Sequence, residues 1–456
     1  MNIYIHNEIS HRELDAKLLL GVLATSRGHQ VVISRFKEIT SGIKSGILTP
    51  GIFLTKSLTP DKSKIDRHQK IIDKKSLVTS IDEESGIDQS GYDDFAINRY
   101  SEFTINQSSA VFGWGEEDTE TLKRFYPKCS HKIHKTGSPR ADLWKSFFSD
   151  YWVNPKRMIN KPFLLVSSNL NCTNIRPFHK NFKIISEAGY FQRKPELLKS
   201  FFYHWSEDYK KLFNFVEAIK YLSKNNNGYD IVLRPHPTED MESWKIFLKD
   251  VPNVHVIRQD SITAWLKNAF AVLHNGCTTA IEATISGKPV LTYSPFKMEY
   301  AHDIPNTLGY NINSKEELLI KTNELFKISL TSNKKGNEVK ISKGISNKLY
   351  IDSNELAAEK IIKVWESLDN NNLSKSNNWT NFYLYCKIIN FKEVLHKILG
   401  NFFPSKFKPF KDNQKFPPLN EDDIRSRVNR LQDLLGIKEK IECKLLSKKT
   451  ILIKSI

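Results

Sequence analysis

The sequence IVLRPHPTED, at residues 231–240, places an arginine and a histidine directly after a short apolar run, with a proline on each side of the histidine. Proline fixes its own φ and lacks an amide donor, so these prolines predict a rigid turn from which the imidazole of His236 projects. An arginine and a histidine together can bind a phosphate, and the histidine can protonate a departing phosphate oxygen. We therefore predict that Arg234 and His236 bind a phosphate. The alternative is a turn histidine whose partners are backbone groups.

A second candidate sequence, LHNGCTTAIEA, combines a tight turn with the start of a helix. Asn275 and Gly276 are typical of the turn, and Thr278 and Thr279 of the first helical residues, where free amides favour an anion. Glu282 follows one turn later, and acidic residues of other nucleotide-binding folds accept hydrogen bonds from ribose hydroxyls. The pattern predicts a phosphate and ribose site without lysine. The alternatives are simple N-capping by the threonines and a surface charge at Glu282.

The third candidate is a cluster of acidic residues in VTSIDEESG, which also follows an apolar run. A carboxylate here can take a proton from a hydroxyl group or attack a carbon atom as a nucleophile. Neighbouring like charges are expected to raise the pKa of at least one of them, which suits acid–base catalysis. Glu83 and Glu84 are the predicted catalytic carboxylates. The alternative is a solvated acidic turn.

The elements that must position these residues alternate along the chain. Residues 2–6 and 30–34 read as strands, and residues 12–28 between them read as a helix that ends on a glycine. Such alternation predicts parallel sheets flanked by helices. Ligands gather at the carboxyl ends of strands in open parallel sheets, and the three candidate sequences stand at such ends.

The alternation begins again near residue 161, which predicts two α/β domains. Two Rossmann-like, doubly wound domains that face a cleft make up the GT-B architecture of nucleotide-sugar glycosyltransferases, although a fold alone does not establish a function. The predicted parts are an N-terminal, acceptor-side domain at 1–155, a C-terminal, donor nucleotide-binding domain at 160–330, and a helical closing segment with an Asn-rich linker and a basic tail at 331–456.

The net charge of +17 over 456 residues indicates an anionic partner. From Asn371 to the end, 17 Lys and Arg stand against eight Asp and Glu, which gives about half of the excess. The tail sequence FFPSKFKPFK alternates phenylalanine with lysine, a composition that suits an anionic membrane surface. We therefore expect peripheral binding at the inner face of the cytoplasmic membrane; the alternative is a solvated appendage packed on the body.

Other features restrict the class of protein. The five cysteines are scattered without a CxxC pair, which indicates reduced thiols. No apolar run approaches the ~18 residues of a membrane-spanning helix, and MNIYIHNEIS lacks the pattern of a signal peptide, so we expect a cytoplasmic protein. We expect no metal and no cofactor, since no paired aspartates stand at a suitable place. No zinc-finger spacing, RNP-type pattern or recognition helix is evident, so no nucleic-acid partner is expected.

Several motifs in order resemble the bacterial surface-carbohydrate biosynthesis proteins, and within them the Kdo transferases of lipopolysaccharide and capsule assembly that use CMP-Kdo. The resemblance covers roughly residues 1–330. It rests on EISHRELDAKLLL with SRGHQVVI, SIDEESG, VFGWG, KTGSPRADLW, RPHPTED and NGCTTAIEATISGKPVL.

The resemblance implies roles for the candidate residues. His236 would bind the phosphate of CMP and assist its departure, and Thr278 and Thr279 match paired hydroxyls of the more distantly similar bacterial sialyltransferases. The acidic motif of those enzymes is two acids followed by glycine, whereas here a serine intervenes, so both Glu83 and Glu84 remain candidates. Asn169 is a further candidate for the donor site, as is Glu239.

The expected function is the transfer of an acidic sugar, most plausibly Kdo, from a CMP-activated donor to a lipid-linked or growing surface glycan. A CDP-glycerol-type polyol-phosphate transferase is the first alternative, since it would share the RPHP and hydroxyl motifs. The second is a non-enzymatic, basic nucleic-acid-binding or scaffold protein.

Overall fold

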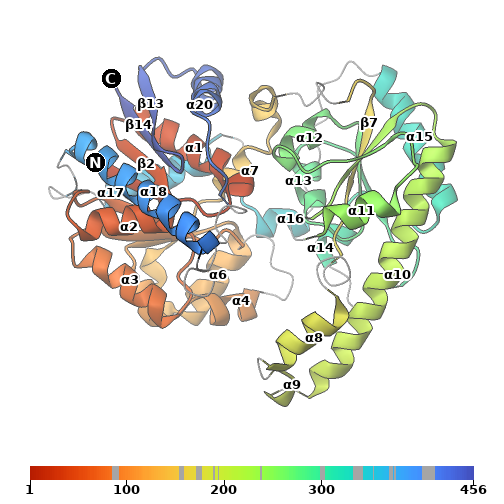
Figure 1. Ribbon diagram of the computed structural model, residues 1–456, viewed down its shortest axis with the longest axis horizontal. Helices are drawn as coiled ribbons and strands as arrows, with labels where there is room; N and C mark the ends of the chain where they lie inside the picture. The colour runs from red at the N-terminus through yellow and green to blue at the C-terminus, as the bar shows by residue number, and fades with distance from the viewer. Residues whose placement is uncertain are drawn as a thin grey trace. The chain divides into compact units, whose positions relative to one another are not determined.

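The computed structural model forms two compact units (Figure 1), one of Met1–Leu143 with Ser342–Ile456 and one of Trp144–Ile341. It describes residues 1–84, 92–153, 159–170, 177–187, 190–193, 195–236, 239–297, 303–331, 343–352, 354–368, 373, 376–402 and 416–456.

The first unit is built on an eight-stranded sheet in the order β13-β14-β2-β1-β3-β4-β5-β6. Strands β1 to β6 are parallel, and β14 joins β2 in the antiparallel direction. The strands are β1 (Asn2–His6), β2 (Gln30–Ser34), β3 (Ile52–Thr55), β4 (Leu77–Ile81), β5 (Ala110–Gly113), β6 (Ile133–Lys135), β13 (Ile441–Ser447) and β14 (Thr450–Ser455).

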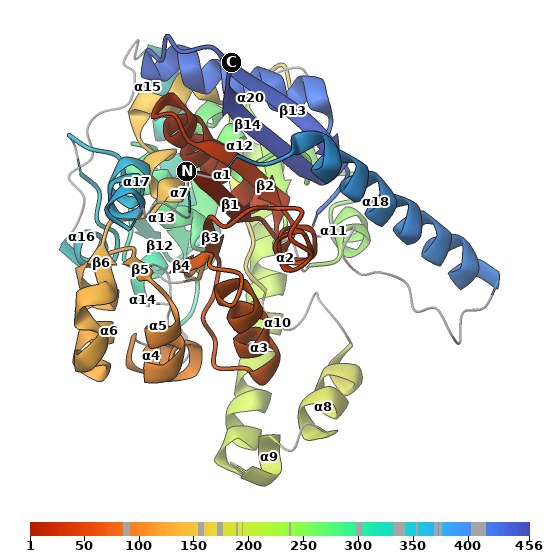
Figure 2. The same ribbon diagram turned by 90° about the vertical axis from the view of Figure 1, so that its left-hand side faces the viewer.

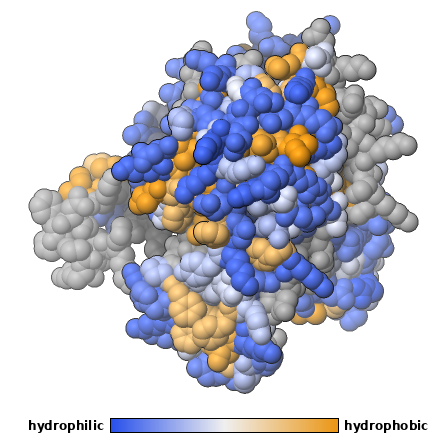
Figure 3. Space-filling view, turned by 90° about the vertical axis from the view of Figure 1, so that its right-hand side faces the viewer, coloured by the Kyte–Doolittle hydropathy of each residue, from blue (hydrophilic) through white to orange (hydrophobic). Residues whose placement is uncertain are grey.

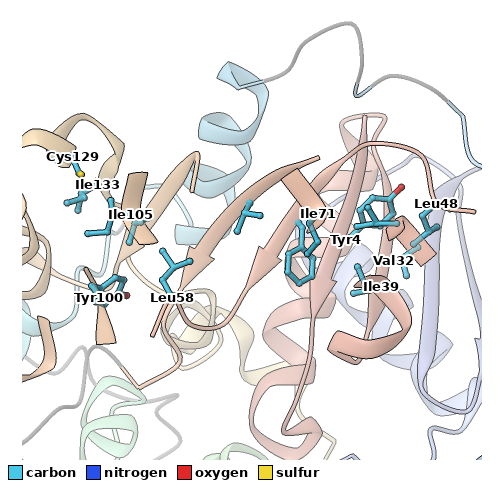
Figure 4. Close-up of a cluster of buried hydrophobic side chains, with 14 of the residues drawn as sticks. Tyr4, Val32, Ile39, Leu48, Leu58, Ile71, Tyr100, Ile105, Cys129 and Ile133 are labelled. Atoms are coloured by element: carbon cyan, nitrogen blue, oxygen red, sulfur yellow. The ribbon is translucent and has the colours of Figure 1, made fainter. Parts of the chain in front are cut away.

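Helices cover this sheet, and the longest of the first 143 residues, α1, follows β1 and is buried over most of its length. The helices of the unit are α1 (Ser10–Ser26), α2 (Phe36–Lys44), α3 (Lys62–Ile72), α4 (Tyr92–Arg99), α5 (Glu102–Gln107), α6 (Glu116–Phe125), α7 (Pro139–Asp142), α16 (Lys343–Lys348), α17 (Ala357–Ser367), α18 (Trp379–Phe402) and α20 (Glu421–Leu435), with a 3₁₀ turn η2 (Pro127–Lys132). One buried core joins side chains from the strands and helices of this unit, including Tyr4, Val32 and Ile39 (Figure 4).

The C-terminal residues belong to the first unit. Phe382 and Cys386 of α18 are buried in its core, and β13 and β14 extend its sheet. The sequence pattern predicts a helical closing segment and a tail here and gives no sign of this hairpin. Its apolar positions in the sequence KTILIK pair with β2, a contact between residues more than 400 positions apart that no local pattern reveals.

The second unit has a six-stranded sheet of parallel strands in the order β12-β11-β10-β7-β8-β9. With β7 in the middle and later strands added on both sides, this is the order of dinucleotide-binding Rossmann folds. The strands are β7 (Phe163–Ser167), β8 (Asp230–Arg234), β9 (Val254–Val256), β10 (Ala271–His274), β11 (Val290–Tyr293) and β12 (Tyr310–Ile312).

One helix of this unit is much longer than the others, the 30-residue α10. Aromatic rings of α8 and α10 cluster around Phe178. Apolar side chains gather over these helices at the lower end of the view in Figure 3. The helices are α8 (Phe178–Glu187), α9 (Tyr190–Arg193), α10 (Glu196–Asn225), α11 (Met241–Phe247), α12 (Ile262–Asn268), α13 (Thr279–Ile285), α14 (Asp303–Asn306) and α15 (Lys315–Thr331), with a 3₁₀ turn η3 (Ser146–Tyr151).

The two strand orders confirm the prediction of two Rossmann-like, doubly wound domains. The units divide between Leu143 and Trp144, and the last residues of the chain return to the first unit, which differs from the predicted three consecutive parts. The predicted cleft stays a prediction. In the part of the chain that the structure describes, no helix is long and apolar enough to cross a membrane.

Candidate functional site

The sheet of the second unit changes direction of growth between β7 and β10, which lie side by side at its centre. Such a switch point leaves a crevice outside the carboxyl ends of the strands, where ligands of this fold bind. The loops that follow β7, β8 and β10 are therefore the parts of this unit in which the predicted donor-site residues must meet.

Hydrogen bonds join the loop after β7 to the loop after β10. The amide of Asn169 donates to Oδ1 of Asn275 at 2.8 Å, and Nδ2 of Asn169 donates to the carbonyl of Gly276 at 2.9 Å. The Ser167 hydroxyl donates to the Thr279 hydroxyl at 3.2 Å. Four residues predicted from separate parts of the sequence, namely Asn169, Asn275, Gly276 and Thr279, thus lie at one place.

Two polar groups at this place are without a partner among the described residues. Nδ2 of Asn275 makes no hydrogen bond, although the residue is only 4% exposed. A buried donor without an acceptor costs free energy, and a ligand oxygen can supply the missing bond. The hydroxyl of Thr278, at the partly exposed first position before α13, also makes no hydrogen bond to the described part of the chain.

His274, at the end of β10, shapes this turn and was missed by the sequence analysis. Its Nδ1 accepts hydrogen bonds from the amides of Gly276 at 3.0 Å and Cys277 at 3.2 Å, and its Nε2 contacts the Thr292 hydroxyl at 2.8 Å. The Thr292 hydroxyl donates to the carbonyl of Leu308, so the imidazole Nε2 carries the hydrogen. Burial lowers the pKa of His274 to about 3, and the ring is neutral near pH 7.

This arrangement shows which amides of the turn already have a partner. The φ of +101° at Gly276, a value suited to glycine, helps direct two backbone amides inward to the His274 ring. Those two amides are therefore occupied and are not among the donors left for an anion. A histidine at the end of an apolar strand, within LHNG, is the one signal in the sequence that points to this role.

Glu239 joins the loop after β7 to the helix after β8. Its carboxylate accepts hydrogen bonds from the Ser168 hydroxyl at 2.7 Å, the Leu170 amide at 2.8 Å and Nε1 of Trp244 at 2.7 Å. Burial raises the pKa of this carboxyl group, while the hydrogen bonds act in the opposite direction. Glu239 therefore fixes the loops around the switch point with bonds that leave little capacity for a ligand.

Arg234 is the last residue of β8 and His236 follows the strand, but the two residues have different surroundings. The guanidinium of Arg234 donates to the carbonyls of Gln259 and Asp260 and lies 5.6 Å from the centre of the Trp265 ring. Burial lowers its pKa to about 10. Arg234 thus supports the loop before α12, and its contact with a phosphate stays a prediction.

His236 is exposed, and its backbone carbonyl is held by the amide of Glu239 at 2.9 Å and by Nη2 of Arg258 at 3.0 Å. Pro237 and Thr238 of the same motif lie outside the described residues. Arg258, just after β9, was missed by the sequence analysis. Its position after a short apolar run, in VIRQD, is the signal that could have identified it.

Glu282 is 6% exposed, so the alternative of a surface charge is wrong. The carboxylate accepts a hydrogen bond from the Thr263 hydroxyl of α12, and it raises the pKa of nearby Arg234 and Lys267. Burial is the stronger influence on Lys267 and lowers its pKa to about 8. The predicted contact of Glu282 with a ribose is untested.

In the first unit, the acidic cluster follows β4. Glu83 is 4% exposed and forms an ion pair with Lys17, and Nη1 of Arg140 lies 3.8 Å from it. The Glu84 side chain is 50% exposed and pairs with Arg12 at 2.8 Å. Ser85 and Gly86 of the motif lie outside the described residues.

One acid of this cluster has a raised pKa, as expected, but the main cause is burial and not repulsion between the acids. Burial favours the neutral form of both glutamates, but the facing cations outweigh it and lower the pKa of Glu83 and of Glu84. The group with a raised pKa is Asp82, where burial prevails over the bidentate contact with Arg99. Repulsion between neighbouring acids is therefore not the dominant influence, because each acid has its own cation.

No model of a protein family matches this chain, and neither does any curated protein. Among solved structures, a protein assigned as a UDP-N-acetylglucosamine 2-epimerase from Listeria monocytogenes has a TM-score of 0.49 at 15% identity, over 80% of this chain and 96% of that chain. The UDP-GlcNAc 2-epimerase from Neisseria meningitidis bound to UDP-GlcNAc gives 0.42 at 14%, over 80% and 100%. The wall teichoic acid polymerase TagF gives 0.43 at 10%, over 70% and 72%. Likeness at this level carries no inference about activity.

Proposed function

We propose that the protein is a glycosyltransferase of surface-polysaccharide biosynthesis that transfers an acidic sugar, Kdo, from a CMP-activated donor to a lipid-linked or growing glycan. The observation that carries this proposal is the switch point of the second unit, where the loops after β7 and β10 meet around a buried amide donor without a partner. The order of motifs along the chain, which resembles CMP-Kdo-dependent transferases, supports the choice of donor.

The proposed donor contacts begin with the two polar groups at the switch point that have no partner among the described residues. Nδ2 of Asn275 and the hydroxyl of Thr278 donate hydrogen bonds to the phosphate of CMP. His236, exposed on a turn that Arg258 and Glu239 hold in place, donates to the oxygen that leaves the sugar. As the bond from the anomeric carbon to that oxygen breaks, its electron pair stays on the phosphate, and a donated hydrogen bond stabilises the added charge.

The acceptor hydroxyl must lose its proton as its oxygen bonds to the anomeric carbon. We assign this contact to Glu84, whose carboxylate is half exposed beside Arg12. Glu83 is enclosed by Lys17 and Arg140 and positions the turn instead. The reaction proposed here uses no metal and no cofactor.

The direct test is to incubate the purified protein with CMP-Kdo or with CDP-glycerol and to measure released CMP, with and without EDTA. We expect turnover of CMP-Kdo that EDTA leaves unchanged. Turnover of CDP-glycerol alone would instead favour the polyol-phosphate transferase. Failure of CMP to raise the unfolding temperature, together with salt-dependent DNA binding, would favour the scaffold alternative.

A pair of histidine variants tests the role of the turn. His236→Ala is expected to lower CMP release by a factor of about 10² to 10⁴, the usual range for a lost general acid. His179→Ala removes an exposed histidine of α8 in the same unit and is expected to leave the rate unchanged. Equal rates for both variants would contradict the proposed role of His236.

A further inference from the structure

The first unit has its own switch point, between β1 and β3, and a cavity of about 510 Å³ opens there. Residues that follow β1, β2 and β3 line it, together with residues of α3. Glu8, the first residue of EISHRELDAKLLL, is the one lining residue that comes from a motif singled out in the sequence, and the cavity lies entirely within one unit.

The cavity is strongly cationic. Glu8 is its one acidic lining residue, and its cationic lining residues are Arg35, Lys37, Lys56, Lys64, Arg67 and Arg99. Lys56 pairs with Glu8 and Arg99 pairs with Asp82.

Lys64 differs from the paired cations, since it makes no ion pair with any described residue. Burial lowers the pKa of Lys64, and the charge of Arg99 lowers it further. The ammonium group therefore stands in a place that favours an incoming negative charge.

Two buried imidazoles add polar groups that have no partner in the described chain. Nδ1 of His6, a residue 8% exposed, and Nε2 of His68 make no hydrogen bond. Both rings are packed against the Phe36 ring, and both histidines line the cavity. Buried polar groups in native proteins are nearly always paired, so two orphans at one cavity indicate a missing ligand or its bound water.

We propose that this cavity binds an oxyanionic group, a phosphate or a carboxylate, that is carried by the glycan acceptor. The assignment to the acceptor rests on the proposed function, whereas the binding of the anion does not. Charge-assisted hydrogen bonds from Lys64 and Arg67 hold the oxyanion, and the neutral imidazoles complete its contacts.

The test is calorimetric titration of the full chain with glucose 6-phosphate, glucuronate and uncharged glucose. We expect binding of at least one anionic sugar and none of glucose, and the two anions distinguish phosphate from carboxylate. Lys64→Gln is expected to weaken this binding about tenfold, as the loss of one charge-assisted bond would. Lys70→Gln, an exposed lysine on the same helix outside the cavity, serves as the matched control.

Absence of binding by both anions, or equal affinities of Lys64→Gln and Lys70→Gln, would overturn the proposal. Arg67→Gln provides a second variant if Lys64→Gln fails to fold. CMP is titrated into the same samples. If CMP binds and the anionic sugars do not, anion binding at the cavity is refuted and the proposed donor site is retained. If the anionic sugars bind and CMP does not, the proposed donor site is refuted and anion binding at the cavity is retained.

A separate observation concerns α18, which is apolar on two faces. Phe382, Cys386 and Ile389 are buried against the first unit. On the other face a row at spacings of three and four residues is exposed, and Figure 2 shows the helix extending away from the β13–β14 hairpin. The exposed apolar residues are Leu384, Ile388, Phe391, Val394, Leu395 and Ile398.

We propose that this face of α18 lies in the interface of an anionic lipid bilayer, parallel to its surface. Lys387 and Lys392 lie on the same helix, and the sequence that follows, residues 403–415, contains four lysines and one aspartate. An apolar row with adjacent lysines matches an anionic bilayer better than it matches a second copy of a chain with a net charge of +17.

Sedimentation of the full chain with vesicles tests this surface. We expect more binding to vesicles that contain phosphatidylglycerol than to phosphatidylcholine alone, and a several-fold loss in Phe391→Ser. Ile320→Ser removes an equally exposed apolar side chain from α15 and serves as the control, since the two residues are 69% and 71% exposed. Undiminished vesicle binding of Phe391→Ser, or a dimer in solution that Phe391→Ser dissociates, would overturn the proposal.

Discussion

The two units differ in the chemistry at the carboxyl edges of their sheets. At the carboxyl edge of the first sheet, the acidic side chains Asp82, Glu83 and Glu84 each face a cation. At the same edge of the second sheet, the loops are joined mainly by amides, hydroxyls and the neutral ring of His274. A parallel sheet thus determines where the loops meet, and the loop residues determine whether the meeting place is charged or neutral.

This difference has consequences for stability. A buried ion pair leaves an uncompensated charge when one partner is removed, which costs more than a lost neutral hydrogen bond. The stability of the first unit should therefore depend on single charged side chains at this edge. The stability of the second unit should depend on packing and on neutral hydrogen-bond donors and acceptors. Substitutions of Lys17, His274, Thr279 and Thr278 test this contrast, in order of decreasing effect on stability.

The largest effect is expected from Lys17→Met, because Glu83 then stays buried with Arg140 as its remaining neighbour at 3.8 Å. Breaking such a pair costs about 4 kcal/mol, to be measured as the free energy of unfolding in urea. The cations lower the pKa of Glu83 in the folded protein, so its stabilisation is present above the ordinary value near 4.5 and is lost as the pH falls through the lowered pKa. This loss on acidification should be weaker in Lys17→Met.

The double variant Lys17→Met with Glu83→Gln serves as the control. Removing both charges should recover a large part of the stability, since no bare carboxylate remains. If the double variant is as unstable as the sum of the two single variants, the ion pair does not explain the effect.

His274→Ala is expected to have the next largest effect, about 3 kcal/mol, because two buried amides and the Thr292 hydroxyl lose a partner and a cavity forms. The pKa of His274 is about 3 in the folded protein, against 6.5 ordinarily. As the pH falls below 6.5, the unfolded chain binds a proton that the folded chain excludes, and stability is lost. The gap between the parent protein and His274→Ala should therefore narrow on acidification.

The same urea experiment at neutral pH and at about pH 5 measures this narrowing. His255→Ala, which removes a partly exposed histidine paired with Asp230 at 3.1 Å, is the matched control in the same unit. A pH-independent gap between His274→Ala and the parent would show that His274 is not the buried neutral group.

Much of the fold could be predicted from the sequence because alternating strands and helices leave a local pattern. The predicted strands at 2–6 and 30–34 coincide with β1 and β2. The β13–β14 hairpin could not be predicted in the same way, because its partner β2 lies at the other end of the chain. Local periodicity reports local structure, and long-range pairing leaves no comparable trace.

The candidate site was partly predictable for a related reason. Asn275 and Gly276 are residue types that favour turns, so the sequence alone predicts the position of this loop. The hydrogen-bond and ion-pair partners of each side chain could not be predicted, because they come from loops that are distant in the sequence. Arg234 was predicted to bind a phosphate, but in the structure it donates to the carbonyls of Gln259 and Asp260. Glu83 was predicted to be affected mainly by the neighbouring acids, but it forms an ion pair with Lys17.

The smallest effects on stability are expected from substitutions of Thr278 and Thr279. These two residues also best distinguish an effect on stability from an effect on ligand affinity. The Thr279 hydroxyl contacts Ser167 and Cys277 at 3.2 Å each, so Thr279→Val should cost about 1 kcal/mol. Thr278→Val removes a partly exposed hydroxyl without a partner in the described chain, and its effect on unfolding should stay within about 0.5 kcal/mol. Calorimetric titration should nevertheless show a loss of CMP affinity of about tenfold in Thr278→Val. Thr284→Ala, further along the same helix, should change neither quantity by much. Unchanged CMP affinity in Thr278→Val would mean that the neutral edge of the second sheet binds its ligand without this hydroxyl, and the donor contacts would then have to be reassigned to Asn275 and His236 alone.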